Sequence, residues 1–198
     1  MNFAKCNITE VLKETHVRFT SLAKQKGLEF TLQVPEKDFY AHVNQEAFTK
    51  IISNLLNNGM KYAESYVHVM LEIPETDDDN LFRIRTVNDG VIIPDEMKEE
   101  IFKPFVRFNE QEDGKVTTGT GIGLALSRSL AELHQGTLAM ETGEESNIFC
   151  LTLPVVQDMT ITLTPEAEVE IDRVNEIPAE QAGRKDNRPT VLVVEDNP

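Results

Sequence analysis

Apolar residues recur at helical spacing in three stretches of the chain. The clearest stretch is Gln45–Tyr62, where an i, i+3, i+4, i+7 pattern predicts an amphipathic helix capped by Asn44. Its apolar face consists of Phe48, Ile51, Ile52, Leu55 and Leu56. A similar pattern predicts a helix over Ile8–Lys26, and Gly27 follows where such a helix would stop. A third helix follows a glycine-rich passage and is closed by Gly136.

Shorter apolar or alternating runs predict strands between these helices. The predicted strands are residues 28–34, Tyr40–Val43, 66–73, 81–87, 137–141 and 147–153. The acidic turn 75–80 joins two of them into a predicted hairpin, and the charged residues 95–100 predict a short helix. Since helices and strands alternate along the chain, we expect an α/β fold class, with a mixed sheet backed by helices in a two-layer sandwich.

Composition narrows the classes of function. The chain has 198 residues, of which 40% are hydrophobic, enough for a buried core. Its formal net charge of -15 argues against nucleic acid as a partner, because binding to a phosphate backbone depends on clustered Lys and Arg. The two cysteines lack the spacing of a disulfide framework or a zinc site and fit a reducing cytoplasm. No apolar run is long enough to span a bilayer, so we expect this stretch not to be membrane-inserted.

Composition also divides the chain into three parts. Residues 3–154 carry the whole pattern of predicted helices and strands. Residues 155–189 are rich in Glu and Asp and poor in large apolar residues, which predicts an acidic, poorly ordered linker. Residues 190–198 open with a pure β run, which predicts the first strand of a further domain.

A polar stripe lies beside the apolar face of the predicted helix Gln45–Tyr62. Asn54, Asn58 and Lys61 form it at i, i+4 and i+7. Asparagine is a poor helix former, so its repeated use in one helix has a cost. Two interpretations stay open: a solvated helix face, or a site where Asn58 offers a neutral oxygen to Mg²⁺ and Lys61 faces a phosphate.

A glycine cluster stands directly before the third predicted helix. Its sequence is Gly119-Thr120-Gly121-Ile122-Gly123. The backbone N–H groups of this turn and the positive end of the helix could receive a phosphate. A flexible loop before an ordinary helix start is the alternative. The cluster is neither a P-loop, since it lacks G-K-[ST], nor a Rossmann turn, since the glycine spacing and a preceding strand are absent.

Four short motifs follow one another in a fixed order. They are Asn54-Leu-Leu-Asn-Asn58-Gly-Met-Lys61-Tyr62, Asn88-Asp-Gly90 with Ile93-Pro94, Ile101-Phe-Lys-Pro-Phe105, and Gly119-Thr-Gly121-Ile-Gly123-Leu124. They resemble the N, G1, F and G2 boxes of the catalytic domain of sensor histidine kinases, and the resemblance covers residues 3–154. It implies a Bergerat-type ATP-binding fold, with ATP and Mg²⁺ as cofactors beneath a mobile lid.

The resemblance implies roles for individual residues. Asn58 resembles the Mg²⁺ ligand, Asn54 a catalytic residue near the γ-phosphate, and Lys61 both a catalytic residue and a nucleotide contact. Further nucleotide contacts implied by position are Tyr62, Asn88, Asp89, Gly90, Ile93, Thr118, Gly119, Thr120, Gly121, Ile122, Gly123 and Leu124.

Three residues correspond to the lid and its hinge. Phe102 and Phe105 resemble the hydrophobic hinge, with ordinary core aromatics as the alternative. Arg107 falls in the lid and could reach phosphates, with a solvated surface charge as the alternative. All three are counted among the expected nucleotide-binding residues.

The sequence departs from the family pattern at a few positions. The adenine-binding aspartate of the family corresponds to Asn88, and the second glycine of the same box to Ile92. The Asn88 oxygen can still accept the adenine amino hydrogen, without a charge-assisted contribution of about 1 kcal/mol, so we expect weaker ATP binding. Asp89 could substitute if the loop shifts by one residue. Gly59 replaces the usual alanine and costs the helix about 1 kcal/mol, unless close packing requires it.

The expected partners are other domains of a two-component phosphorelay. None of the histidines has the acidic neighbour and downstream proline of a phosphoacceptor motif, so we expect surface or packing roles for His16, His42, His68 and His134. The resemblance places the phosphoacceptor histidine on a separate dimerisation domain, without which this stretch should not phosphorylate itself. Residues 190–198 resemble the opening strand of a receiver domain, where Glu195 and Asp196 match the Mg²⁺-binding acidic pair. Together they imply a hybrid sensor kinase, with a receiver domain or response regulator as partner, in the cytoplasmic part of a membrane-bound sensor.

Two other functions stay open. The ATPases that share the fold, such as gyrase B, MutL and the ninety-kilodalton heat-shock chaperones, place a glutamate base where this chain has Asn54. An amide cannot deprotonate water, so phosphoryl transfer to a histidine is favoured over hydrolysis. The changes at Asn88 and Ile92 leave a second alternative, a degenerate domain that only binds a partner. Measurable ATP affinity distinguishes that domain from a working one.

Overall fold

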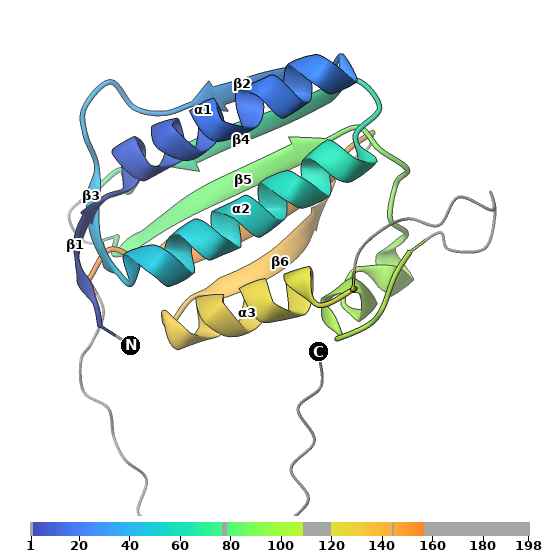
Figure 1. Cartoon of the computed structure of the whole chain (residues 1–198). Coiled ribbons are helices and arrows are strands. Elements are labelled where there is room, and N and C mark those ends of the chain that lie inside the picture. Colours follow the sequence, from blue (N-terminus) through green and yellow to red (C-terminus); the bar gives the residue numbers. More distant parts are fainter. Residues whose placement is uncertain (1, 77–78, 109–119, 144, 157–198) are drawn as a thin grey trace, which may run out of the picture. The chain divides into compact units, whose positions relative to one another are not determined.

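A five-stranded mixed sheet carries the fold, and three helices pack on one of its faces (Figure 1). The computed structural model describes residues 2–76, 79–108, 120–143 and 145–156. The helices are α1 (Ile8–Lys26), α2 (Gln45–Tyr62) and α3 (Gly123–Leu133). Across the sheet the strands are β2 (Glu29–Gln33), β4 (Tyr66–Glu72), β5 (Leu81–Asn88), β7 (Asn147–Pro154) and β6 (Thr137–Thr142). This arrangement confirms the predicted fold class.

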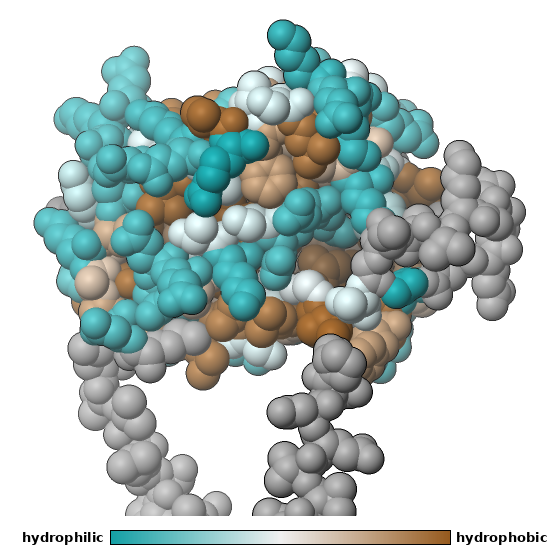
Figure 2. All heavy atoms as spheres, in the orientation of Figure 1, coloured by the Kyte–Doolittle hydropathy of each residue, from teal (hydrophilic) through white to brown (hydrophobic). Residues whose placement is uncertain are grey.

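The sheet register agrees with the predicted alternation along the strands. β2 runs parallel to β4, whereas β4, β5, β7 and β6 pair antiparallel, so the predicted hairpin is β4 with β5. The helices meet the sheet through the apolar face of α2, with Phe48, Ile51 and Leu55 fully buried. Their neighbours in the core include Phe82, Ile84, Phe149 and Leu151 from β5 and β7. Figure 2 shows that hydrophilic residues dominate the outer side of this helical layer.

Two local elements differ from the sequence-based expectation. An additional strand, β1 (Ala4–Asn7), pairs antiparallel with β3 (Tyr40–Val43) in a separate two-stranded sheet. Four residues carry too little pattern to predict a strand, and only the distant partner stabilises it. The predicted short helix over 95–100 is two 3₁₀ turns, η1 (Asp95–Met97) and η2 (Glu100–Phe102), each held by i→i+3 bonds.

α3 ends just before Gly136, as predicted, but the glycine is needed there for a different physical reason. Gln135, not Gly136, takes the left-handed conformation, with φ 58°. Gly136 is required by packing, because a Cβ atom there would lie 2.2 Å from the Thr152 carbonyl oxygen. The glycine therefore allows the chain leaving α3 to approach β7.

A buried histidine connects α2 and α3. His134 is fully buried, and its Nε2 accepts a hydrogen bond of 3.1 Å from the Asn44 backbone N–H. Its Nδ1 must therefore carry the proton donated to the Leu130 carbonyl at 2.6 Å. This neutral tautomer fixes the start of α2 against the end of α3, a packing role as expected. Among the described residues, no helix combines the length and apolar character needed to cross a membrane.

Candidate functional site

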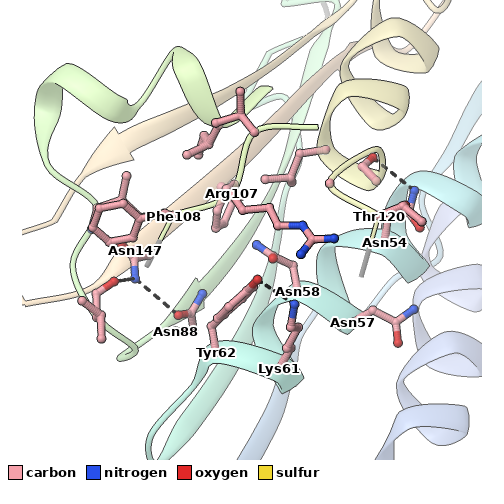
Figure 3. A pocket seen from close by; sticks show the side chains of 18 residues that line it. Asn54, Asn57, Asn58, Lys61, Tyr62, Asn88, Arg107, Phe108, Thr120 and Asn147 are labelled. Carbon is pink, nitrogen blue, oxygen red and sulfur yellow. Dashed lines mark hydrogen bonds between the residues drawn. The ribbon is translucent and has the colours of Figure 1, made fainter. Parts of the chain in front are cut away.

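A cavity of about 340 Å³ opens between α2, the start of α3 and the loops that follow β5 (Figure 3). This volume falls in the usual range for a small-molecule site. Among the described residues that line it, two are cationic, Lys61 and Arg107, and none is a carboxylate. In a chain of net charge -15, the pocket is therefore a local site for an anion. The lining residues are Asn54, Asn57, Asn58, Lys61, Tyr62, Asn88, Val91, Ile93, Ile101, Val106, Arg107, Phe108, Thr120, Gly121, Gly123, Leu124, Asn147 and Phe149.

The polar stripe of α2 faces this cavity. Asn54, Asn58 and Lys61 all line it, so the stripe is not a solvated helix face alone. The Lys61 ammonium donates to the Tyr62 hydroxyl at 2.7 Å and lies 4.5 Å from the centre of the Tyr62 ring (Figure 3). This neighbouring pair places one cation beside the polar end of the pocket.

Asn54 connects α2 to the start of α3. Its amide nitrogen donates to the Gly123 carbonyl at 3.3 Å and to the Ser127 hydroxyl at 3.1 Å. Both amide hydrogens are thereby used, so only the side-chain oxygen remains for a ligand. An oxygen acceptor cannot bind a phosphate directly, but it can hold a donor such as a metal-bound water.

The first turn of α3 differs from those of the other two long helices. Asn7 caps α1 and Asn44 caps α2 through side-chain hydrogen bonds to Glu10 and Ala47, whereas α3 has no side-chain cap. Its first residues, Gly123 and Leu124, line the cavity. Uncapped N–H groups at a helix N-terminus are an anion-binding arrangement.

Gly121 holds the turn before α3 in place. It adopts φ 69°, and a Cβ atom there would lie 2.9 Å from the Cα of Phe105. Its carbonyl also accepts a 3.0 Å bond from the Phe105 N–H. Thr120 and Gly121 both line the cavity, whereas Thr118 and Gly119 lie outside the described residues.

The opposite end of the cavity is apolar apart from two buried asparagines. Asn88 is 2% and Asn147 3% exposed. The Asn147 nitrogen donates to the carbonyls of Gly90 at 3.2 Å and Val91 at 3.0 Å, and its oxygen accepts from the Ile93 N–H at 3.0 Å. Asn147 therefore fixes the loop after β5 through three backbone groups.

The orientation of the Asn88 amide corrects a sequence-based expectation. Its oxygen accepts from the Gly90 N–H at 3.2 Å and lies 3.5 Å from the Asn147 nitrogen. Because both neighbours are donors, the oxygen must face them and the nitrogen must face the cavity. The oxygen is thus already engaged by protein donors, whereas the expectation above had it open to an adenine amino group.

Asp89 points away from the cavity and cannot substitute for Asn88. Its carboxylate accepts from the backbone N–H groups of Glu64, Ser65 and Tyr66 at 3.0 to 3.1 Å, and from the Ser65 hydroxyl. Burial acts to raise the pKa of Asp89, but the hydrogen bonds from Ser65, Tyr66 and Glu64 outweigh it and hold the pKa well below its usual range. The carboxylate therefore stabilises the turn into β4.

Several other expected contacts lie off the cavity wall. Gly90 is packed beneath it, where a Cβ atom would meet the Tyr62 carbonyl oxygen at 2.0 Å. Phe102 is buried in the core, 6.4 Å from the Phe149 ring and under the Arg128 guanidinium at 4.0 Å. Phe105 is 73% exposed, and Ile122 is 39% exposed. None of these four residues is among the described residues that line the cavity.

The structure also brings residues to the cavity that were not among the predicted site residues. These are Asn57 and Ile101, which lie within the quoted motifs, and Val91, Val106, Phe108, Asn147 and Phe149. Asn147 could have been noticed in the sequence, because asparagine is unfavourable in a strand. A buried asparagine also needs a specific hydrogen-bond partner. The apolar residues had none, because a pocket wall and a core share the same residue types.

The donor set fits a magnesium ion that arrives with a phosphate ligand. Among the described residues, no group of three or more His, Cys, Asp or Glu side chains is placed to hold a metal. Mg²⁺ usually takes few protein ligands and completes its shell with phosphate oxygens and water. The amide oxygen of Asn58 in the cavity wall is suited to that use.

Comparison with known protein families identifies the family to which the chain belongs. Residues 43–157, more than half of the chain, match the family described as histidine kinase-, DNA gyrase B-, and HSP90-like ATPase. The chain belongs to this ATPase family, as the four motifs predicted.

Individual relatives are sensor histidine kinases. The chain is 28% identical to sensor histidine kinase WalK of Bacillus subtilis over 150 residues, which are 72% of this chain and 24% of WalK. It is 29% identical to sensor protein VanSC of Enterococcus gallinarum over 148 residues, 75% of this chain and 40% of that protein. The chain therefore spans less than half of either relative.

A solved structure confirms the fold. The catalytic domain of histidine kinase ThkA superposes with a TM-score of 0.68 at 25% identity, covering 79% of this chain and 97% of that domain.

Proposed function

We propose that this chain is the catalytic domain of a sensor histidine kinase, which binds ATP with Mg²⁺ and donates the γ-phosphoryl group to a histidine on a separate dimerisation domain of the same protein. The observation that carries this proposal is the polarity of the cavity. One end combines Lys61, Asn58 and an uncapped helix start, and the other is apolar with a buried amide. A nucleotide has the same division between phosphates and base.

The chain's own residues favour transfer over hydrolysis. Bound Mg²⁺ supplies neutralisation of the phosphate charge that develops during transfer. Lys61 and the N–H groups of α3 orient the phosphates, and Asn54 fixes the turn that carries those groups. Among the described residues that line the cavity, no carboxylate can act as a base for water. A histidine acceptor, itself nucleophilic, does not require such a base.

The proposed partners rest on the relatives. Histidine kinase P4 of Formosa agariphila is 27% identical over 211 residues, which cover 98% of this chain and 15% of that protein. That match extends over almost the whole chain, including residues 157–198, which lie outside the described residues. From the sequence we propose an acidic linker at 155–189 and the start of a receiver domain at 190–198. ThkA has been solved in complex with its response regulator protein TrrA. By analogy, we propose a receiver domain or response regulator as phosphate acceptor, and a cytoplasmic location in a membrane-bound sensor.

Calorimetric titration with a non-hydrolysable ATP analogue tests this function. We expect saturable binding in the presence of Mg²⁺ that weakens about tenfold in Asn58→Ala, corresponding to about 1.4 kcal/mol for one lost oxygen contact. Thermal unfolding of the variant checks that the fold is intact. Absence of binding for every purine nucleoside triphosphate at millimolar concentration would overturn the proposal.

A further inference from the structure

Arg128 connects α3 to two other parts of the fold. Its Nε donates a hydrogen bond of 3.1 Å to the Leu138 carbonyl on β6. Its two terminal nitrogens donate to the two carboxylate oxygens of Glu99, at 2.8 and 3.3 Å. The guanidinium carbon also lies over the Phe102 ring, 4.0 Å from its centre. Because a guanidinium is rigid and planar, the bidentate pair and the ring contact together fix how Glu99 and Phe102 approach α3.

These contacts hold a residue of the cavity wall from both sides. Ile101 lines the cavity, is 5% exposed, and lies between Glu99 and Phe102 in the chain. α3 begins at Gly123, which lines the cavity at its phosphate end. Arg128 itself is not among the described residues that line the cavity. It therefore connects one wall to the phosphate end from outside the space that a ligand would occupy.

The segment that carries Ile101 has little regular structure of its own. It consists of the 3₁₀ turns η1 and η2, whose backbone hydrogen bonds are local, as from the Met97 N–H to the Pro94 carbonyl. Such turns are short and have poor hydrogen-bond geometry, so contacts from other elements decide where they lie. Packing of Ile101 in the core anchors the segment, and Arg128 adds the contacts that fix it against α3.

The ion pair is better suited to fixing geometry than to stabilising the fold. The Glu99 side chain is 74% exposed and that of Arg128 25% exposed. An exposed ion pair contributes little to stability, because water and salt screen it. The hydrogen bonds from Arg128, and then its charge, lower the pKa of Glu99 below its usual value, so the pair stays ionised at neutral pH. We therefore expect the pair to matter for the shape of the cavity more than for folding.

Resting on the proposed function, we infer that Arg128 is a positioning residue for the nucleotide, which holds Ile101 at a fixed distance from the start of α3 so that one ligand contacts both. A site whose walls are fixed in advance binds its ligand without a further cost of ordering them. Loss of the Arg128–Glu99 pair therefore lowers nucleotide affinity, although neither residue is among the described residues that line the cavity.

Glu99→Ala gives the sharpest test, because two explanations predict opposite signs. Removal of a negative charge near an anion site would by itself raise the affinity for a nucleotide. Loss of the positioning contact should lower it, by about two- to fivefold. Calorimetry with Mg²⁺ and a non-hydrolysable ATP analogue measures the change. The matched control Glu96→Ala removes the same charge from an exposed position in η1 and should not lower the affinity.

Arg128→Met removes the whole set of contacts and keeps much of the apolar stem. We expect the affinity to fall about tenfold. The matched control Arg85→Met removes another guanidinium, which pairs with Glu72 and Glu141 at 3.0 Å each and does not line the cavity. It should leave the affinity unchanged. Thermal unfolding shows whether each variant is folded at the temperature of titration, and Glu99→Ala decides alone if Arg128→Met is not.

Two results would overturn the inference. One is an unchanged or raised affinity in a folded Glu99→Ala chain. The other is an equal fall in the Arg128→Met and Arg85→Met chains, which would indicate a general loosening of the fold. Failure of the unaltered chain to bind the analogue would instead overturn the proposed function, and this inference with it.

Discussion

The two ends of the cavity differ in how firmly the protein holds their polar groups. At the base end, Asn88 and Asn147 are almost fully buried, and protein groups fix both amides. At the phosphate end, Lys61 bonds to its exposed neighbour Tyr62, and α3 begins without a side-chain cap. A preorganised amide distinguishes one ligand atom from another, whereas a lysine ammonium and a helix start attract any anion. Selectivity therefore belongs to the base end and general affinity to the phosphate end.

The largest effect is expected for Asn147→Ala, which removes the hydrogen bonds that hold the loop after β5 at the base end of the cavity. The change leaves Ile93 N–H, two carbonyls and the Asn88 oxygen without this partner. We expect the free energy of unfolding to fall by about 2 to 3 kcal/mol, and nucleotide affinity to fall at least about tenfold. Urea unfolding and calorimetry measure the two effects.

Asn80→Ala is the matched control for that variant. Asn80 also bonds to backbone groups, those of Val156, but lies away from the cavity. It should lower stability without lowering nucleotide affinity. If both variants lose affinity equally, the loop fixed by Asn147 has no special role in binding.

A smaller effect is expected at the phosphate end from Lys61→Ala. Loss of one cation near the phosphates should weaken binding of a non-hydrolysable ATP analogue by about five- to thirtyfold, because a charge-assisted bond contributes about 1 to 2 kcal/mol. The matched control Lys50→Ala changes an exposed lysine on the same helix and should leave the affinity unchanged. Equal affinities for the Lys61→Ala and Lys50→Ala chains would contradict the placement of the phosphates beside Lys61.

Asp89→Asn should affect stability but not the nucleotide. The folded-state pKa of Asp89 is lowered, so its carboxylate contributes stability above the unfolded pKa of about 3.9, and this contribution is lost as the pH falls below that value. At neutral pH we expect the variant to lose about 1 to 2 kcal/mol through weaker hydrogen bonds to the turn. Its stability should depend less on pH between about 5 and 3 than that of wild type. Unfolding curves over that range measure both, and weakened nucleotide binding would contradict the outward orientation of Asp89.

The smallest effect is expected for Gly59→Ala. Alanine gains about 1 kcal/mol in helix propensity, but its Cβ would lie 3.1 Å from a Val67 methyl carbon. We expect these terms to cancel to within about 0.5 kcal/mol. In a Val67→Ala background the crowding disappears, so Gly59→Ala should stabilise that chain by about 1 kcal/mol. A double-mutant cycle, measured by urea unfolding, compares the effect of Gly59→Ala on the free energy of unfolding in the two backgrounds. Equal effects would exclude crowding as the reason for this glycine.

The sequence predicted the long elements because their pattern repeats. α1 and α2 agree with the predicted bounds, and each end of the six predicted strands lies within one residue of its observed position. The stripe of Asn54, Asn58 and Lys61 was visible for the same reason, since three residues at helical spacing share one face. β1 was not predicted, and the short helix predicted at 95–100 is two 3₁₀ turns, because elements this short carry too little pattern to fix their type.

The sequence by itself therefore determined the class of fold, the helix that carries the polar stripe and the order of the four motifs. Only the tertiary structure decided that Asn147 joins the site, that Phe102 and Asp89 leave it, and which end of the Asn88 amide faces the ligand. The physical reason is that periodicity records the face on which a residue lies. The direction of an amide is set by donors and acceptors that lie close only after β5 and β7 pair, with Asn88 opposite Asn147.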